Sequence, residues 1–498
     1  MSTPIPPNEA SFSLQELLQA TSGKLIVMGP GSSTNQVVID SRRVSPGSLF
    51  VALRGERFDA HQFLPQVAEL GAAVALVEAP RPELGALTQI QVPCTLTALG
   101  DVARAHRLRW GGLVLTVAGS AGKTTTKACV AAALEALLPG AVHGERGNLN
   151  NRVGAPMVLL RCQPHHQIAV VEVGTNQPGE VAELTRIAAP DLAVLTRIDY
   201  EHSEGLGELD AIEAEEGAAL LGLRPGGVAI GNEDDHRVRR QLDRGVGVRR
   251  VSYGESPSSD YRLLSRTPLG HSGARLEVSC AVEQSGSPTQ STITLETPLL
   301  GAPGALATLA ALAATDAVAA RLERPRVSPE ALSAALQVPQ VIEPGRLAAQ
   351  TLSDGSLLLD DSYNSNPGSV LSSLAAAHEL ATARGARLQV VLGEMLELGE
   401  LSAREHARVG AELAAFAPSG VIAVQGEAAR FSEAAAAQGI PSVFVADADA
   451  ALRRLIDTHR AGDVLLIKGS RGVRLDRVVS ALASGALGAP ARAAGSVE

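Results

Sequence analysis

The strongest structural signal in the chain is the stretch Leu113-Val114-Leu115-Thr116-Val117-Ala118-Gly119-Ser120-Ala121-Gly122-Lys123-Thr124-Thr125-Thr126-Lys127. Its apolar first half predicts a strand, and a helix over 124–138 follows a glycine-containing turn. Such a turn suits phosphate, because backbone N–H groups and the helix N-terminus face the oxygens, Lys123 adds a full positive charge and a threonine hydroxyl can bind Mg²⁺. We therefore expect residues 119–125 to bind a nucleotide. Because the spacing is shorter than GxxxxGK[ST], a Gly/Thr-rich turn with a chance lysine is the alternative.

Strands and helices alternate on the C-terminal side of this turn. Apolar strands over 168–173, 192–196 and 228–231 are separated by helical stretches such as 179–188. This alternation indicates a mostly parallel sheet with helices on its faces. Residues 251–300 interrupt the pattern with antiparallel strands, and a second alternating unit then runs toward the end of the chain.

We therefore expect an α/β fold of three domains. A small N-terminal α/β domain would cover 1–108, a central P-loop domain with a parallel sheet 109–338, and a C-terminal Rossmann-like α/β domain 339–486. The Ala/Gly-rich tail over 487–498 is expected to be disordered. The length of 498 residues suits three domains of ordinary size.

The composition excludes several classes of protein. Hydrophobic residues make up 45% and charged residues 19% of the chain, which excludes wholesale disorder. The 43 basic and 53 acidic residues give a net charge of −10 without a Lys/Arg block, which argues against a nucleic-acid partner. No apolar run reaches the roughly 18 residues of a membrane span, and no secretory signal is visible. Four separated cysteines fit a reducing cytoplasm and no structural zinc.

Lysine and asparagine are rare in this chain. Only four of the 43 basic residues are lysines, namely Lys24, Lys123, Lys127 and Lys468. In a chain that otherwise uses arginine, we expect a lysine where its compact ammonium group is needed, because arginine cannot imitate it. Asparagine occurs nine times, and seven of these residues fall in candidate motifs, at Asn148, Asn150, Asn151, Asn176, Asn232, Asn364 and Asn366.

Polar side chains follow the strands next to the phosphate-binding turn, where sheets of this kind bind their ligands. Glu172 lies inside an apolar strand, and a buried carboxylate needs a cation. A Mg²⁺ shared with the nucleotide would supply one, and pairing with an arginine is the alternative. His202 follows the next strand in a cluster of acids, or is a solvated surface histidine. Asn232 follows a third strand as a base or ribose contact, or as part of a polar turn.

Ordered motifs run along nearly the whole chain. The central part contains Gly119–Lys127, Gly147–Asn151, Val171–Gly174 and Glu201–Gly205. The outer parts contain Asp40–Val44, Pro46–Leu53, Pro344–Arg346, Asp360–Pro367, Gly393–Gly399 and Lys468–Gly472. This set resembles the Mur ligase family, which comprises ATP-dependent amide-forming enzymes of cell-wall precursor synthesis.

The resemblance implies a role for each domain. The N-terminal domain would hold the uridine nucleotide of the substrate, with Ser41 and Arg42 as candidate contacts. The central domain would hold ATP, and the C-terminal domain would bind the incoming amino compound. The implied catalytic residues are Lys123, Glu172 and His202.

The resemblance also implies ligands for metal, ATP and substrate. Thr124 and Glu172 would bind a Mg²⁺ that bridges the ATP phosphates, and His202 would serve a second Mg²⁺. The implied ATP contacts outside the phosphate-binding turn are Asn232, Arg346, Asp361 and Asn364. The residues implied to face the substrate and the γ-phosphate are Asn148, Asn150 and Asn151.

Within the family, Asp360–Pro367 is most similar to the member that adds D-alanyl-D-alanine to UDP-N-acetylmuramoyl-tripeptide. The member that adds the third amino acid usually carries DNPR in this domain. The resemblance therefore implies a monomeric, cytoplasmic ligase of peptidoglycan precursor synthesis, which uses ATP and Mg²⁺ and forms an acyl phosphate. Two alternatives remain. One is another amide ligase, such as the third-residue-adding member or a folylpolyglutamate-synthase-like enzyme, and the other is a degenerate nucleotide-binding protein.

Four places depart from the family pattern. The family usually has a lysine, modified by CO₂ to a carbamate, where Glu216 stands here. Glu216, or Glu215 after a small shift, could replace it as an oxygen ligand of Mg²⁺. A solvated helix face that carries Glu213 and these two residues is the alternative. The other departures are Arg197 for an asparagine, Pro303–Ala307 for the polar adenine-side motif, and Asp59-Ala60-His61 for Asp-Gly-His.

Overall fold

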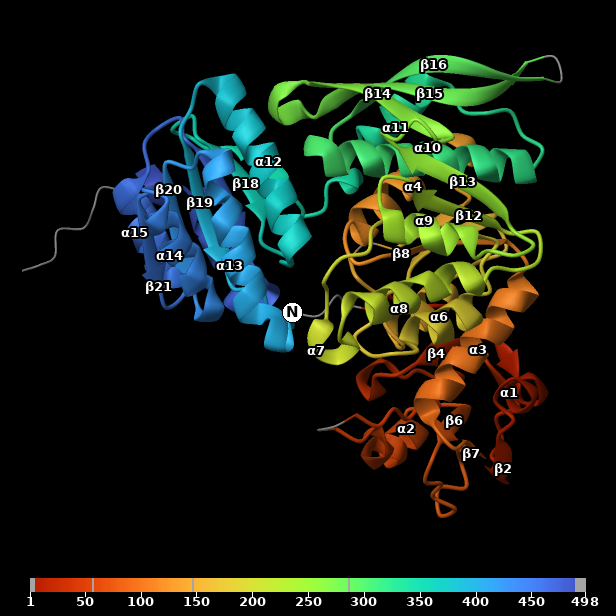
Figure 1. The fold of residues 1–498 in the computed structure, drawn as a ribbon. Coiled ribbons are helices and arrows are strands. Elements are labelled where there is room, and N and C mark those ends of the chain that lie inside the picture. Colours follow the sequence, from red (N-terminus) through yellow and green to blue (C-terminus); the bar gives the residue numbers. More distant parts are fainter. Residues whose placement is uncertain (1–4, 56–57, 146, 285–286, 489–498) are drawn as a thin grey trace, which may run out of the picture.

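The computed structural model describes residues 5–55, 58–145, 147–284 and 287–488. They form three successive α/β units, each with its own sheet, so the expected fold class is confirmed. In Figure 1 the N-terminal unit is red and orange at the bottom, the central unit runs from orange to green, and the C-terminal unit is cyan and blue at the side.

The N-terminal domain is a small sheet covered by short helices. Its strands are β1 (Phe12–Ser13), β2 (Lys24–Val27), β3 (Ser33–Thr34), β4 (Gln36–Val38), β5 (Ser48–Val51), β6 (Val74–Val77) and β7 (Thr88–Gln91). Its helices are α1 (Leu14–Thr21), α2 (Leu64–Glu69) and α3 (Thr95–Trp110). The five-stranded sheet has the order β2-β7-β6-β5-β4 and is antiparallel only between β2 and β7, while β1 pairs with β3 separately.

The central domain is built on a nine-stranded sheet. Its strands are β8 (Leu113–Ala118), β9 (Val142–Gly144), β10 (Ile168–Glu172), β11 (Leu192–Leu195), β12 (Val228–Asn232), β13 (Arg249–Gly254), β14 (Tyr261–Pro268), β15 (Ala274–Gln284) and β16 (Ser287–Thr297). The order is β16-β15-β14-β13-β12-β11-β8-β10-β9, parallel from β9 to β14 and antiparallel from β14 to β16. The sequence pattern missed β9, which has only three residues, and β13, which begins with two arginines.

Helices cover both faces of this sheet. They are α4 (Lys123–Leu137), α5 (Gly154–Leu159), α6 (Glu180–Ala188), α7 (Ser203–Leu206), α8 (Leu209–Leu221), α9 (His236–Asp243), α10 (Gly301–Arg321) and α11 (Pro329–Leu336). Side chains of β8 alternate between two cores, as the strand period requires. Leu115 and Val117 pack with α4 and α10, whereas Val114 and Ala118 pack with α3, α5, α6 and α8. The second core continues into the N-terminal domain.

Helix α10 is long and apolar enough to cross a membrane, although no such run was expected from the sequence. Within the part of the chain that the structure describes, it is the one helix that meets this test. However, 83% of its apolar window is buried inside the protein, where it packs on α4 and on β12, β13 and β14. Its apolar composition therefore reflects its place in the core.

The C-terminal domain is a six-stranded sheet with helices on both faces. Its strands are β17 (Ala348–Thr351), β18 (Leu357–Asp361), β19 (Leu388–Gly393), β20 (Gly420–Val424), β21 (Ser442–Val445) and β22 (Val464–Lys468). Its helices are α12 (Pro367–Arg384), α13 (Ser402–Glu412), α14 (Ala429–Ala437), α15 (Ala448–Thr458) and α16 (Asp476–Ala483). The order is β17-β18-β22-β19-β20-β21, with only β17 antiparallel.

The expected domain limits stay predictions. The limit after residue 108 falls inside α3, and that after 338 lies between α11 and β17. Of the tail expected over 487–498, residues 489–498 lie outside the described residues, whereas Ala486–Gly488 forms a short 3-10 turn instead of being disordered.

A buried ion pair joins α3 to the central sheet. Arg107 is 1% exposed, and its Nη2 lies 2.7 Å from Oδ2 of Asp191, just before β11. The guanidinium also donates to the carbonyls of Ala188 and Gly112 at 2.9 and 2.8 Å. Asp191 Oδ2 accepts a further hydrogen bond from Val114 N at 3.1 Å. The end of α3 is therefore fixed to the strands that carry the site.

We expect Arg107→Met to lower the free energy of unfolding by about 3 kcal/mol, because it leaves a buried carboxylate without its main partner. The matched control is Arg186→Met. The Arg186–Asp101 pair at 3.0 Å likewise involves α3, which it joins to α6, but it is partly exposed. This control should cost about 1 kcal/mol or less. Urea unfolding measures the free energy of unfolding of both variants. Equal losses of stability would contradict a special role for the buried Arg107–Asp191 pair.

Candidate active site

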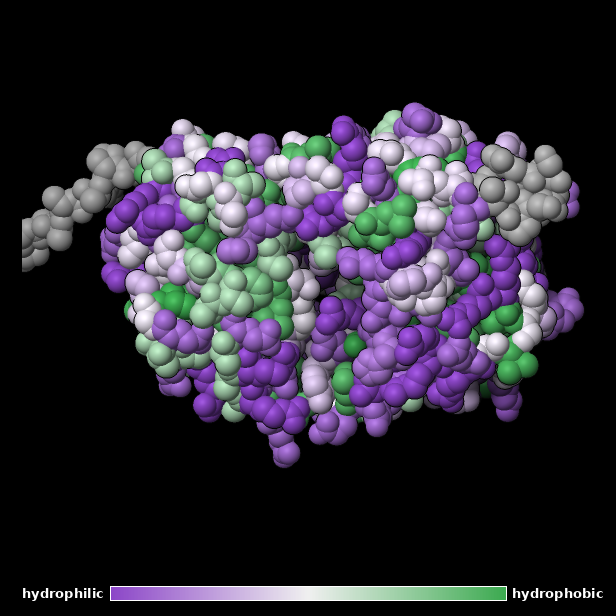
Figure 2. Space-filling model, turned by 45° about the horizontal axis from the view of Figure 1, so that its top comes forward, coloured by the Kyte–Doolittle hydropathy of each residue, from purple (hydrophilic) through white to green (hydrophobic). Residues whose placement is uncertain are grey.

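A cavity of about 500 Å³ lies between the central and C-terminal domains. Figure 2 shows the hollow between the two halves of this face, with the C-terminal domain on the left. The lining comes from the carboxyl ends of β8, β10, β11 and β12, from the start of α10, and from β18, β22 and α12. Parallel sheets bind their ligands at such strand ends.

The phosphate-binding turn connects β8 to α4. Gly119 has φ +123°, and a Cβ at this position would lie 2.3 Å from Thr196 Oγ1, so a side chain does not fit. Gly122 has φ +84° and directly precedes Lys123, the first residue of α4. Ser120 N donates to Arg197 O at 2.7 Å and anchors the turn to the end of β11. The turn therefore combines free helix N–H groups with a lysine, as phosphate binding requires.

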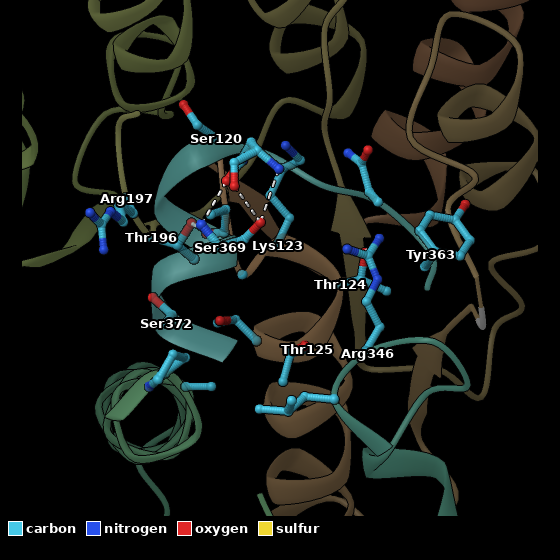
Figure 3. A pocket seen from close by; sticks show the side chains of 18 of the residues that line it. Ser120, Lys123, Thr124, Thr125, Thr196, Arg197, Arg346, Tyr363, Ser369 and Ser372 are labelled. Atoms are coloured by element: carbon cyan, nitrogen blue, oxygen red, sulfur yellow. Dashed lines mark hydrogen bonds between the residues drawn. The ribbon is translucent and has the colours of Figure 1, made fainter. Parts of the chain in front are cut away.

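Lys123 lines the cavity (Figure 3). It pairs with Glu201. Its Nζ lies 2.7 Å from Glu201 Oε2, and each side chain is 11% exposed. Burial alone would lower the pKa of the Lys123 ammonium, but the negative charges of Glu201 and Glu216 outweigh burial and raise this pKa. Glu201 Oε1 also accepts a hydrogen bond from Asn364 Nδ2 at 3.4 Å. The pair therefore connects the central to the C-terminal domain.

Glu172, at the end of β10, is the meeting point of several segments. Its Oε1 accepts hydrogen bonds from Asn150 Nδ2 at 2.8 Å and from Thr124 Oγ1 at 3.2 Å. Its Oε2 lies 3.2 Å from Lys127 Nζ, within ion-pair distance but not in hydrogen-bond geometry. The cation partner is thus a lysine, not the arginine considered above. Burial opposes ionisation, but Lys127, Lys123 and Arg346 together lower the pKa of Glu172.

Arg346 brings the C-terminal domain to this point. Its Nη2 donates to Thr124 Oγ1 at 3.3 Å, and its guanidinium lies 4.2 Å from the ring centre of Tyr363. Figure 3 shows Arg346 and Tyr363 beside Thr124. The stacked ring restricts the arginine and aims it at the phosphate-binding turn.

His202 contacts both domains. It has the left-handed φ of +52°, its Nδ1 pairs with Glu397 of the C-terminal domain, and its Nε2 lies 3.8 Å from Glu201 Oε1. Burial would lower the pKa of His202, but Glu397 and Glu201 outweigh burial and raise it. His202 is therefore paired with two carboxylates, and the solvated-surface alternative is wrong.

Asp361 and Lys468 form a third buried pair of the site, at the ends of β18 and β22. Lys468 Nζ lies 2.7 Å from Asp361 Oδ2 and donates to Asn364 O at 3.0 Å. Asp361 Oδ1 accepts from Leu347 N at 3.1 Å. These contacts fix the loop that carries Tyr363 and Asn364 over the cavity.

The opposite end of the cavity is mostly apolar. Asn232 lines it, and its Oδ1 accepts a hydrogen bond from Asp234 N at 3.1 Å, so this residue is part of a polar turn. Its contact with the base or ribose stays a prediction. Arg197 also lines the cavity and lies 3.3 Å from Asp199. The residues that stand in place of the polar adenine-side motif contribute apolar or backbone surface, namely Pro303, Gly304, Leu306 and Ala307.

The three glutamates of α8 are buried, so the alternative of a solvated helix face is wrong. Glu213 binds Arg237, Arg240 and Gln241 of α9. Glu215 accepts from Gly179 N at 2.7 Å and Val181 N at 2.8 Å and thereby caps α6.

Glu216 holds the phosphate-binding turn from behind. Its Oε2 accepts from Gly119 N at 2.7 Å, and burial raises the pKa of its carboxyl to about 7 although Lys123 opposes this. Glu216 is not one of the described residues that line the cavity. Its expected role as a metal ligand stays a prediction.

The expected uridine contacts lie outside this cavity. Ser41 is buried and Arg42 is exposed in the N-terminal domain, where Arg42 pairs with Asp40 at 2.7 Å. In the altered motif nearby, His61 Nδ1 lies 2.6 Å from Asp59 Oδ1 and His61 Nε2 accepts from Glu78 N at 2.9 Å. The residues expected to bind the uridine nucleotide therefore lie in the N-terminal domain, apart from the cavity.

Five residues of the site were not proposed from the sequence as site residues, namely Lys127, Glu201, Tyr363, Glu397 and Lys468. The rarity of lysine could have identified two of them, because all the lysines except the exposed Lys24 lie in or against the cavity. Asparagine rarity carried the same signal, since seven asparagines line the cavity. Glu397 carries no such signal, because its role depends on how the two domains meet.

The described residues contain no group of three or more His, Cys, Asp or Glu side chains that could hold a metal ion by themselves. A metal at Glu172 would therefore share its coordination with Thr124, water and a bound phosphate. The buried Glu172 Oε2, which accepts no hydrogen bond, fits such a site.

Comparison with known proteins gives matches over most of the chain. Residues 34–107 match the family model described as "Mur ligase family, catalytic domain". Residues 117–315 match the "Mur ligase middle domain", and residues 345–471 match the "Mur ligase, glutamate ligase domain". The chain is 34% identical over 474 residues to the UDP-N-acetylmuramoyl-tripeptide–D-alanyl-D-alanine ligase of Escherichia coli (strain K12), covering 95% of this chain and 98% of that protein. The protein of the same name from Bacillus subtilis (strain 168) is 30% identical over 461 residues, covering 90% and 92%.

Solved structures agree with these matches. MurF from Acinetobacter baumannii superposes with a TM-score of 0.81 at 30% identity, covering 97% of this chain and 100% of that chain. MurF ligase from Thermotoga maritima in complex with ADP gives a TM-score of 0.75 at 25% identity, covering 90% and 97%. The resemblance seen in the sequence motifs is thus confirmed: the chain belongs to the Mur ligase family.

Proposed function

We propose that this protein uses ATP to join the carboxylate of UDP-N-acetylmuramoyl-tripeptide to the amino group of D-alanyl-D-alanine. The observation that carries the proposal is the single cavity in which the phosphate-binding turn meets the Tyr363–Asn364 loop of the C-terminal domain. Full-length similarity to ligases with this name supports the choice of substrates.

The chemistry requires activation of a carboxylate. A carboxylate oxygen attacks the γ-phosphorus of ATP and the bond to the β-phosphate oxygen breaks, which gives an acyl phosphate and ADP. The dipeptide amine then attacks the acyl carbon, loses a proton and expels phosphate. Both partners of the first step are anions, so the site must offset their repulsion. Lys123 and the N–H groups at the start of α4 are placed to do so.

For Mg²⁺ we propose Thr124 and Glu172 as ligands beside the phosphates, since their oxygens suit this hard cation. When bound, Mg²⁺ would neutralise phosphate charge and orient the γ-phosphate. His202 is proposed to serve a second Mg²⁺. It would do so as a neutral imidazole through Nε2, while its Nδ1–H could still be donated to Glu397.

Other ATP contacts are proposed from residues that line the cavity on both sides. They are Asn232 from the central domain, and Arg346, Asp361 and Asn364 from the C-terminal domain. The apolar surface at Pro303–Ala307 would take the base by burial more than by hydrogen bonds. Asn148, Asn150 and Asn151 are proposed to face the substrate, with Ser41 and Arg42 holding its uridine nucleotide.

We propose that Glu216 acts on the site through Gly119 and Lys123, because its carboxylate holds the turn and adds negative charge behind it. Direct ligation of a second Mg²⁺ would require the Glu216 carboxylate to reach the cavity, which it does not line. We also propose a monomeric enzyme of the cytoplasm, in keeping with its four free cysteines.

The proposal is tested by phosphate release from ATP, with each substrate omitted in turn and with single amino acids offered in place of the dipeptide. Release should need both proposed substrates and give a product heavier by one dipeptide. Release with a single amino acid would favour another amide ligase. ATP binding without release under any combination would favour a degenerate nucleotide-binding protein.

In this assay Lys123→Met should lower the rate by about 100-fold or more, because one positive charge on the transferred phosphate is lost. Lys24→Met is the matched control, since Lys24 is exposed on β2, and it should leave the rate unchanged. Near wild-type activity of Lys123→Met would remove this lysine from the mechanism.

The raised pKa of Glu216 predicts a pH-dependent stability. The folded-state pKa of about 7 exceeds the usual 4.5. Between these two pH values the folded protein therefore keeps the Glu216 proton, which the unfolded chain has already lost. Ionisation of Glu216 therefore destabilises the fold as the pH rises through this window. The free energy of unfolding of Glu216→Gln, relative to that of the wild type, should therefore rise by about 2 kcal/mol as the pH increases from about 5 to about 8. Urea unfolding of the nucleotide-free protein measures this, and a pH-independent difference would contradict it.

A further inference from the structure

Lys127 lies one helical turn after Lys123 on α4, and only 3% of its surface is exposed. Its Nζ donates to the carbonyl oxygen of Gly147 and lies 3.2 Å from Glu172 Oε2. One ammonium group thus touches both a backbone carbonyl and the carboxylate proposed to hold Mg²⁺. The one role derived above for this residue is that of cation partner to Glu172.

Gly147 begins the loop that carries the asparagines proposed to face the substrate. Its φ is +77°, and its N–H donates to Glu343 Oε1 at 3.3 Å in the segment that leads to the C-terminal domain. Further along the loop, Asn150 Nδ2 donates to Glu172 at 2.8 Å and Asn150 O accepts from Gly174 N at 2.9 Å. The loop is therefore held at both ends, by Lys127 at Gly147 and by Glu172 at Asn150.

Neutralising Glu172 does not by itself explain Lys127. Lys123 and Arg346 also lower the pKa of Glu172, so its charge is compensated from several sides. The contact that Lys127 alone adds among these cations is the hydrogen bond to Gly147 O. A compact ammonium on a straight chain reaches both partners at once, whereas the planar guanidinium of arginine differs in shape and reach. This accounts for a lysine here in a chain that otherwise uses arginine.

We propose that Lys127 is a positioning residue of the ligase, which fixes the loop over 147–151 against Glu172. The substrate-facing asparagines and the carboxylate for Mg²⁺ then keep one mutual geometry before any ligand arrives. The consequence for catalysis rests on the proposed function, whereas the consequence for the loop rests on the structure alone.

Amide hydrogen exchange of the ligand-free, full-length protein tests the loop directly. Lys127→Met should speed exchange in residues 147–155 by about 10-fold or more, because a charge-assisted hydrogen bond is lost. Exchange in the core helix α10 should stay unchanged, and Lys24→Gln is the matched control. Where Lys127→Met fails to fold, Lys127→Gln replaces it, since its shorter amide cannot span both partners. Unchanged exchange in 147–155, or an equal rise in α10, would overturn the proposal.

Steady-state kinetics of the same variants separate positioning from charge compensation. Positioning predicts a fall of about 10–100-fold in kcat/KM for the UDP-linked substrate, with ADP affinity unchanged. Charge compensation alone predicts an unchanged KM for that substrate and a lower Mg²⁺ requirement, because the charge of Glu172 would no longer be compensated by Lys127. This result would also overturn the proposal. A wild-type protein without ligase activity would reject the proposed function, whereas the exchange experiment would still decide the role of Lys127.

Discussion

The rest of the site depends on one interaction, the pairing of opposite charges that are buried at the carboxyl edge of the central sheet. Lys123 pairs with Glu201 and Lys127 with Glu172, in each case with little exposure to water. Isolated charges would be costly there, so each group requires its partner. The turn after β8, the end of β10 and the segment after β11 must therefore meet, which only the parallel order of these strands allows.

The same groups also connect two domains. Glu201 reaches Asn364, His202 pairs with Glu397, and Thr124 accepts from Arg346. Each of these contacts joins a group of the C-terminal domain to a group proposed to serve phosphate or metal, or to Glu201, the partner of such a group. These groups line the cavity proposed to hold the nucleotide, so we expect nucleotide binding to be coupled to how the two domains sit. This coupling gives a physical reason for a cavity that is divided between domains.

Much of the fold and of the phosphate-binding turn could be predicted from the sequence. The apolar run before Gly119 and the lysine after Gly122 are local signals, and the structure has β8 and α4 there. Glu172 was recognisable because an acid inside an apolar strand needs a partner. The partner itself, Lys127, could not be read from spacing, since α4 and β10 meet only after folding.

The remaining differences have the same cause. Whether Glu213, Glu215 and Glu216 are buried was left open, because three acids on one helix also have the pattern of a solvated face until the neighbours of α8 are known. Short or polar strands such as β9 and β13 are stabilised by pairing with distant segments, not by their own composition. Contacts between domains, such as His202 with Glu397, leave no local trace in the chain.

The central claim is that this cavity transfers the γ-phosphate of ATP to a substrate carboxylate before the amide bond forms. The most direct test labels both carboxylate oxygens of UDP-N-acetylmuramoyl-tripeptide with the heavy isotope and follows the label during ligation to D-alanyl-D-alanine. The account predicts that each released phosphate carries one labelled oxygen. Phosphate without label, released while the amide product forms, would contradict it.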